Sequence, residues 1–430
     1  MDARTAHATI RFGLGRRTGE VLPEDPVAWL VEQVEAPDPA AFSPGLPTTA
    51  DGLTVLREQN KLTLPPNTSL VKPLFDQDVA AHTAQLLTTA APFRERLVWF
   101  WANHFTVSTR QNGLHAVAGP FMREAIRPNV TGSFAGLLLA VMRHPAMLMY
   151  LDNASSAGPN SPVGKNQRRG LNENLARECL ELHTVSPAAG YTQADVTEFA
   201  RILTGWSVDL QRLFPGYLFR DGTHEPGTKT LMGRRFGPGE VNGIAALDWL
   251  ARHPATYHHL ATKLVRHFVS DDAPPAAVAA VAGVLRDTEG DLAAASIALV
   301  HLDAAWTPLA KLRTPQDLAV AALRALDLPA DKQPGLGAAL ATLGQPLWTA
   351  PLPNGWADAA AEWTAPEAMM RRIDWSYALA GRAGDHDPPA VADAALGPLL
   401  TARTRDAMRG AGSRRDALTL LFTSPEFQRR

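Results

Sequence analysis

Apolar residues recur along this chain with the spacing of α-helices rather than that of β-strands. Residues 93–105 show it best, because four side chains at positions i, i+3, i+4 and i+7 would share one face of a helix: Leu97, Phe100, Trp101 and His104. A second helix is expected to follow Thr192, which suits an N-cap and precedes an acidic first turn. The chain is therefore predicted to be all-α, a predominantly helical protein with long irregular loops.

The same periodicity predicts helices along most of the remaining sequence. They are expected from Pro26 onward and over 78–90, 118–127, 133–150, 243–252, 254–269, 275–287, 291–302, 314–326, 336–343, 365–382, 389–409 and 413–423. Three long loops interrupt them, over 152–171, 207–242 and 343–364, and the second is rich enough in glycine and aromatic residues to hold a short hairpin. No strong linker is visible, so we expect one large helical domain over 1–430. The alternative is a second helical unit from about 311, with a boundary near 310.

Polar residues concentrate in the helix expected after Asn172. At about 100° per residue, Leu175, Cys179 and Leu182 form its buried stripe. Three polar side chains would cluster beside that stripe: Asn174, Glu178 and Glu181. His183 falls roughly 160° from Glu181 by the same arithmetic, so these two cannot chelate one ion from this helix.

Two carboxylates one helical turn apart have a recognisable chemistry. Glu178 and Glu181 would raise each other's pKa in a cleft, or bind a divalent cation between them. Either arrangement suits general acid/base catalysis or metal-assisted hydrolysis. The alternative is a solvated helix face in which Arg177 pairs with Glu173 or Glu181. The carboxylate pair needs a partner from another segment.

His104 is the first candidate for that partner. It shares the apolar stripe of residues 93–105 and therefore points inward, next to the polar Asn103. The sequence thus predicts a mixed site in which His104, Glu178 and Glu181 are catalytic and are also the candidate metal ligands. A histidine on an apolar face is, as the alternative, a satisfied core residue.

Residues that would bind a substrate lie partly in the loops. The loop from Asp152 runs through Asn160 to the basic residues Lys165, Arg168 and Arg169, which could hold an anion before a helix N-terminus. His224, on a glycine-bounded turn, could close over the site. The predicted substrate-binding residues are Asn103, Asn160, Arg169, Asn174, Arg177, His183 and His224. The alternative for these segments is an ordered structural or exposed loop.

The net charge and the length of the apolar runs indicate which kinds of partner the protein can bind. The formal net charge is −2, so no global positive field attracts nucleic acid. Apolar runs are too short to span a bilayer, and no signal peptide is visible, so we expect a soluble, cytoplasmic protein without membrane insertion. Export to the periplasm together with a partner is the alternative. The single cysteine, Cys179, is expected to be a buried hydrophobe rather than a nucleophile.

Several motifs together resemble one bacterial family across nearly the whole chain. They include the segments 94–105, 144–153, 170–178, 181–184, 190–196, 203–206 and 420–429. The chain resembles the domain-of-unknown-function 1800 family. Two departures are Cys179, where an aliphatic residue is usual, and Val185-Ser-Pro, where the usual turn is Leu-Gly. The resemblance implies a helical fold, no settled activity, and a possible partner that is an exported sulfatase-like protein of the domain-of-unknown-function 1501 family.

Two functions follow from these observations. The first is a hydrolase-like enzyme with a His/carboxylate pocket, with or without a divalent cation, acting on a polysaccharide or other envelope polymer. The second is a non-catalytic scaffold or partner of the sulfatase-like protein, in which the polar motif is a buried structural network.

Overall fold

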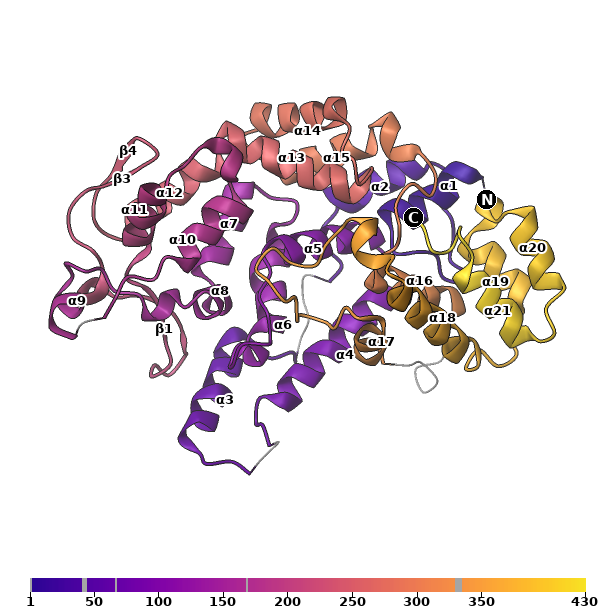
Figure 1. The fold of residues 1–430 in the computed structure, drawn as a ribbon, viewed down its shortest axis with the longest axis horizontal. Helices are drawn as coiled ribbons and strands as arrows, with labels where there is room; N and C mark the ends of the chain where they lie inside the picture. The colour runs from indigo at the N-terminus through magenta and orange to yellow at the C-terminus, as the bar shows by residue number, and fades with distance from the viewer. Residues whose placement is uncertain (1, 41–44, 66–67, 168, 329–334) are drawn as a thin grey trace.

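Helices form most of the molecule, as the apolar periodicity predicts. The computed structural model describes residues 2–40, 45–65, 68–167, 169–328 and 335–430. Figure 1 shows an elongated arrangement in which α10–α12 and the strands lie at one end and α16–α21 at the other, with α5 between them. The prediction of an all-α fold is confirmed.

Up to Leu203, the described residues form α1–α11 and three π-helical segments. Their bounds are α1 Ala3–His7 continuing into a π-helix at Ala8–Phe12, α2 Pro26–Glu35, α3 Thr49–Lys61, α4 Lys72–Thr88, α5 Pro92–His104, α6 Ala118–Phe121 continuing into a π-helix at Met122–Ile126, α7 Phe134–Arg143, α8 Pro145–Tyr150, α9 Pro162–Gln167, α10 Asn174–Glu178 continuing into a π-helix at Cys179–His183, and α11 Gln193–Leu203.

From Trp206 onward, the described residues form four strands and the remaining α-helices. Their bounds are β1 Trp206–Asp209, β2 Gly216–Phe219, β3 Lys229–Leu231, β4 Arg234–Phe236, α12 Glu240–Ala251, α13 Pro254–Phe268, α14 Pro275–Asp287, α15 Leu292–Val300, α16 Pro315–Leu326, α17 Leu336–Leu343, α18 Pro366–Ala380, α19 Pro388–Ala395, α20 Ala402–Arg409 and α21 Arg414–Thr423.

The start of α11 lies where the sequence predicts it, whereas one predicted helix is interrupted in its interior. Thr192 caps α11 with a full capping box, as its sequence predicts. The expected helix over 389–409 is two helices, because the turn at 397–399 contains Pro398, which interrupts a helix interior. The helix α3 was not predicted. In the segment 207–242, two antiparallel hairpins form instead of one: β1 pairs with β2, and β3 with β4.

Buried apolar side chains form two clusters. The first draws on segments from Ala8 to Ala305 and contains α5, α7 and α13. The second contains α16–α21, together with Ile10, Leu14, Leu86 and Leu87 from the first part of the chain. The N-terminal segment therefore packs into both clusters.

Charged side chains also connect the two clusters. Arg96 on α5 donates from Nη1 to Oδ1 of Asp317 at 2.7 Å, and both side chains are almost fully buried. Arg430 places its Nε 3.1 Å from the other carboxylate oxygen. Backbone hydrogen bonds in both directions join Arg430 to Lys311, at 2.7 and 3.0 Å. These contacts fix the first turn of α16 against α5.

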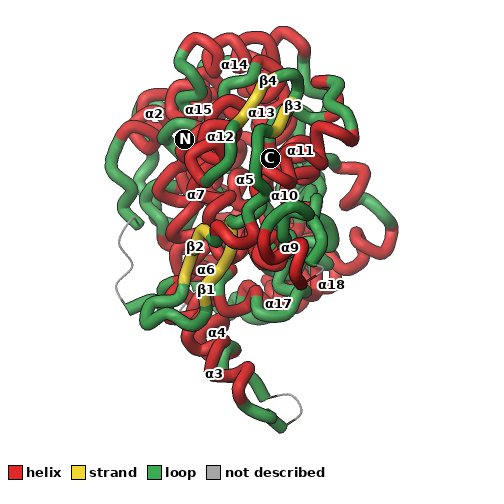
Figure 2. The backbone as a smooth tube through the Cα atoms, turned by 90° about the vertical axis from the view of Figure 1, so that its left-hand side faces the viewer, coloured by secondary structure: helices red, strands yellow, loops and turns green. Residues whose placement is uncertain are grey.

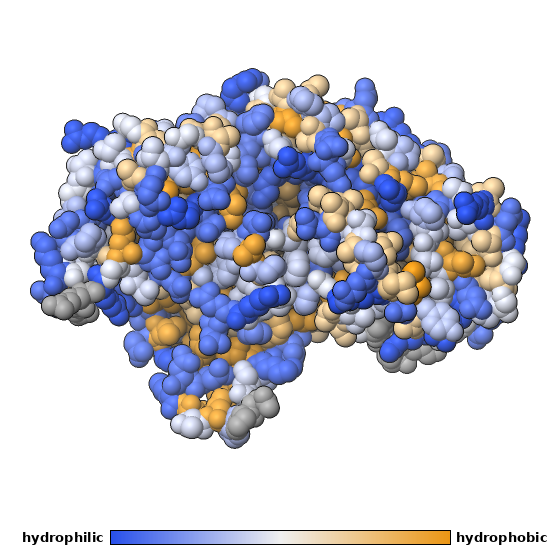
Figure 3. All heavy atoms as spheres, viewed as in Figure 1, coloured by the Kyte–Doolittle hydropathy of each residue, from blue (hydrophilic) through white to orange (hydrophobic). Residues whose placement is uncertain are grey.

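The surface adds two observations. Figures 1 and 2 show α3 and one end of α4 projecting from the body of the molecule. The face in Figure 3 is largely polar, with apolar side chains in scattered groups. Within the described ranges, no helix combines the length and apolar character that crossing a membrane requires.

We predict that D317N strongly destabilises the protein, because it leaves two guanidinium groups buried beside a neutral side chain. Breaking a buried ion pair from one side typically costs about 3–5 kcal/mol. D327N is the matched control, because Asp327 ends the same helix and pairs with Arg17 where both side chains are about one-third exposed; it should change stability by less than about 1 kcal/mol. Chemical denaturation measures both, and equal effects would contradict the prediction.

Candidate active site

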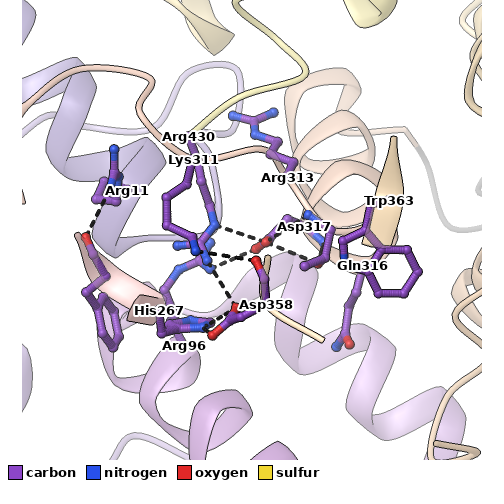
Figure 4. A network of polar contacts seen from close by, with 12 residues as sticks. Arg11, Arg96, His267, Lys311, Arg313, Gln316, Asp317, Asp358, Trp363 and Arg430 are labelled. Atoms are coloured by element: carbon purple, nitrogen blue, oxygen red, sulfur yellow. Dashed lines mark hydrogen bonds and ion pairs between the residues drawn. The ribbon is translucent and has the colours of Figure 1, made fainter. Parts of the chain in front are cut away.

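A cavity of about 480 Å³ lies where α5 and α13 of the first apolar cluster meet α16 of the second. Five segments line it: α5, α13, the loop after α13, the start of α16 and the loop after α17. Its polar lining includes Asn103, His104, Lys263, Arg266, His267, Asp271, Thr314, Gln316, Asp317, Gln345, Asn354, Asp358 and Glu362. In Figure 4, Asp317 and Asp358 converge with Arg96, Lys311, Arg430 and His267, while Arg313 points away. The predicted loop 343–364 thus contributes directly to the cavity.

His267 and Asp358 form a histidine–carboxylate pair at this cavity. Nδ1 of His267 lies 2.9 and 3.0 Å from the two carboxylate oxygens of Asp358. A carboxylate acceptor places the imidazole proton on Nδ1, so Nε2 carries the lone pair. Nε2 is buried and has no hydrogen-bond partner within the described residues. Burial lowers the pKa of His267 to about 4, although Asp358 opposes the shift, so the ring is neutral at pH 7.

Helix α13 is anchored at the end that carries His267. Arg11 donates to the carbonyl oxygens of Phe268 and Val269, at 3.1 and 2.6 Å, and to that of Thr307 at 3.1 Å. Carbonyl groups of the last helical turn lack intrahelical partners, and a buried cation satisfies them. Arg11 therefore holds the final turn of α13 in place.

Two carboxylates of the site, Asp317 and Asp358, are held ionised. Burial alone would raise the pKa of Asp358, but His267, Lys311 and Arg430 keep it well below its usual range. Burial opposes ionisation of Asp317 in the same way, and Arg430 and Arg96 more than offset it, so its pKa is also well below the usual range. Arg430 approaches both carboxylates, with its Nη2 3.8 Å from Asp358.

Lys263 and Arg266 lie on the same helix as His267 and line the same cavity. Neither makes a hydrogen bond or an ion pair with any residue that the structure describes. Burial lowers the pKa of Lys263 to about 8, with Asp358 opposing the shift. The cavity wall therefore holds two cations without a partner beside an unpartnered imidazole nitrogen.

Asn103, a predicted substrate-binding residue, holds the loop after α17 that lines the cavity. Its Nδ2 donates to the carbonyl oxygen of Trp356 at 2.9 Å, and its Oδ1 accepts from the amide of the same residue at 2.8 Å. Both side-chain groups that could contact a substrate are thus engaged by the loop backbone. The geometry favours a positioning role for Asn103.

His104, a predicted catalytic residue, lines the cavity but packs against histidines rather than glutamates. Its Nε2 lies 3.2 Å from the carbonyl oxygen of His183, and its ring centroid is 5.7 Å from that of His183 and 6.3 Å from that of His259. Burial lowers the pKa of His104 well below its ordinary value. Among the described residues it contacts neither Glu178 nor Glu181, so the predicted pairing with those carboxylates is not formed.

The side-chain directions predicted at about 100° per residue are wrong beyond Cys179, because α10 continues there as a π-helix. The wider turn shifts the following side chains from their α-helical directions. Leu180 and His183 are buried as a result, whereas Leu182, predicted to be buried, is partly exposed. His183 belongs to the core face, with neither ring nitrogen bonded to any described residue.

The carboxylates of this helix lie away from the cavity. Glu178 and Glu181 are partly exposed, and Asn174 is exposed. Burial raises the pKa of Glu178, and Glu181 adds to the rise, as expected for two neighbouring carboxylates. Arg177 pairs with Glu173 at 3.0 Å, which is the solvated-face alternative. A catalytic role for the two glutamates stays a prediction, separate from the cavity.

The predicted loop residues lie mostly in a structural network. Glu225 is buried and accepts from both the amide and the side chain of Asn160, at 2.8 and 2.6 Å. His224 has both ring nitrogens engaged by backbone, 2.7 Å from the Thr204 carbonyl oxygen and 2.7 Å from the Gly239 amide. These contacts favour structural roles. Arg169 is exposed, and Arg168 lies outside the described residues.

The predicted metal ligand His104 is not brought together with Glu178 and Glu181. No three His, Cys, Asp or Glu side chains in the described parts of the chain form a metal-binding group. Sequence reasoning missed Lys263, His267, Asp317 and Asp358. The only local signal was the i, i+4 spacing of Lys263 and His267, which puts both on one helix face.

Comparisons with known proteins agree with the predicted resemblance. The family model described as "Protein of unknown function (DUF1800)" matches residues 7–429, nearly the whole chain. No curated protein and no solved structure matches the chain.

We predict that acid destabilises this protein through its buried histidines, and that H183F weakens the effect. Burial lowers the pKa of His183 to about 3, against about 6.5 in the unfolded chain. Its contribution to stability is complete above pH 6.5 and is lost as the pH falls toward 3. The loss for this group is about 2 kcal/mol at pH 5.

Phenylalanine suits the site, because the His183 ring packs 5.0 Å from that of Phe105. Denaturant unfolding at pH 7 and pH 5 should show a smaller difference for H183F than for the wild type. H258N, which changes an exposed histidine, is the control. An unchanged difference in H183F would contradict the prediction.

Proposed function

Since the chain belongs to the DUF1800 family, whose description assigns no activity, we propose its function from the cavity: a hydrolase in which His267 is the general base. One observation carries the proposal. The His267 side chain lines the cavity and is oriented by Asp358 through Nδ1, while its buried Nε2 has no hydrogen-bond partner among the described residues. A base must present a lone pair to the proton that it removes, and the other ring nitrogen needs an orienting acceptor.

Water is the nucleophile in the proposed reaction. The described lining contains neither Ser nor Cys, and the Thr314 hydroxyl donates to Asp317 at 3.1 Å. Nε2 of His267 takes a proton from water while the water oxygen forms a bond to the electrophilic centre of the substrate. The bond to the leaving oxygen then breaks, and the proton passes from Nε2 to that oxygen. The Asp358 carboxylate stabilises the transient imidazolium.

Aromatic side chains support the envelope-polymer substrate that the sequence suggests. Trp99 and Trp356 both line the cavity. Indole faces stack on sugar rings and other flat apolar surfaces, and they offer large contact areas. Hydrolysis of a polysaccharide or related polymer remains part of this proposal.

A scaffold is the second candidate, and a different observation favours it. The polar residues at the start of α10 bond to nearby segments of the chain: Glu173 accepts hydrogen bonds from Arg177, Gln193 and Thr197. Such a network fixes the shape of a surface without requiring a reaction. In this case the protein would accompany the sulfatase-like partner of the domain-of-unknown-function 1501 family.

We predict that H267N and D358N each reduce hydrolysis by at least about 100-fold, the usual contribution of a general base. The assay follows release of nitrophenol from p-nitrophenyl acetate and p-nitrophenyl phosphate. H258N is the matched control, because His258 is exposed on the same helix, and it should stay within about twofold of the wild type. Circular dichroism checks that each variant is folded.

Two outcomes would contradict the enzyme proposal. One is equal rates in the wild type and in folded H267N. The other is no hydrolysis of either ester by the wild type, which would favour the scaffold.

A further inference from the structure

We propose that Lys263 and Arg266 form a subsite for an oxyanionic group of the substrate, a phosphate, sulfate or carboxylate. This inference rests on the proposed function for its term "substrate", and it names the charge class of the molecule that the cavity binds. The binding itself is testable without turnover.

Helix geometry places both cations next to the proposed base. Lys263 and His267 are one turn apart on α13, where side chains at i and i+4 share a face. Arg266 directly precedes His267, and all three side chains line the cavity. A group bound to the two cations would therefore lie in the cavity that the His267 side chain also lines.

The carboxylates of the site are already committed to other cations. Asp271 pairs with Lys311, and Asp317 with Arg96 and Arg430. Asp358 bonds to His267 and lies 3.8 Å from Arg430. Of the four lining carboxylates, only the exposed Glu362 has no such partner in the described structure. Lys263 and Arg266 are therefore not neutralised by the protein itself.

Positive charge is in surplus around the cavity. Five cationic side chains line it or pair with its carboxylates: Arg96, Lys263, Arg266, Lys311 and Arg430. The four carboxylates Asp271, Asp317, Asp358 and Glu362 oppose them. This positive surplus is opposite in sign to the net charge of the whole chain, which is −2.

Burying surplus cations is costly unless an anion joins them. The effect is visible in two lysines, because burial lowers the pKa of Lys263 to about 8 and also lowers that of Lys311. Arg430 is fully buried, and its guanidinium nitrogens make no well-aligned hydrogen bond to a described residue. An oxyanion on Lys263 and Arg266 would offset this cost, and it would raise the pKa of His267 and make that ring a better base.

The experiment compares two double variants that each remove two positive charges. K263M/R266M alters the proposed subsite. K165M/R169M alters the other anion site that the sequence suggests, with exposed Lys165 on α9 and exposed Arg169 after it. Isothermal titration measures binding of inorganic phosphate, sulfate and succinate at constant ionic strength set with chloride. The three titrants distinguish which oxyanion is preferred.

We expect saturable binding of at least one titrant to the wild type. K263M/R266M should weaken it by at least about tenfold, because charge-assisted hydrogen bonds are lost. K165M/R169M should remain within about twofold. H267N should still bind, so loss of turnover with retained binding separates this inference from the proposed function. If the double variant does not fold, R266M alone, which changes an exposed side chain, makes the comparison, with an expected loss of at least about threefold.

Three results would overturn the subsite. They are no saturable binding of any titrant to the wild type, equal binding by K263M/R266M, and loss of binding in K165M/R169M instead. Conversely, a wild type that binds phosphate but hydrolyses neither ester retains the anion subsite and rejects the hydrolase.

Discussion

Asp317 is a carboxylate with almost no access to water, and guanidinium groups from Arg96 and Arg430 lie on either side of it. Its ionisation is possible only because those cations are present, and their burial is possible only because the carboxylate is. The contact joins α5 to the first turn of α16 across 221 residues of sequence. The cavity lies beside this contact, so its shape depends on the same three side chains.

Local features of the fold could be predicted from the sequence because neighbouring residues determine them. Thr192 and Asp195 form the capping box that their spacing indicates, and the apolar stripe of α5 is buried throughout. The π-helix at Cys179–His183 was not predictable in this way. A single wide turn depends on tertiary packing, and it changes which side chains face the core without changing the apolar pattern.

The candidate site was harder to predict than the fold, because its parts come from distant segments. His104 and Asn103 were identified, since they share a helix with a conspicuous apolar stripe. Their partners were not: Asp358 lies in a loop without regular periodicity, and 91 residues separate it from His267. Charged residues that are dense in the sequence, such as those around Glu178, form a conspicuous local pattern, whereas the charges of the cavity meet only after folding.

The two hydrogen bonds between Asn103 and the backbone of Trp356 imitate one rung of a β-ladder with a side-chain amide. The adjoining Gly355 fits the same contact, because a Cβ there would lie 2.4 Å from the Asn103 carbonyl oxygen. The path of the loop after α17 is therefore set by its main-chain groups. Side chains along this loop, such as Asn354 and Glu362, can be exchanged without a change in the backbone path. Such a separation lets the molecule acquire a new ligand preference while its scaffold stays constant.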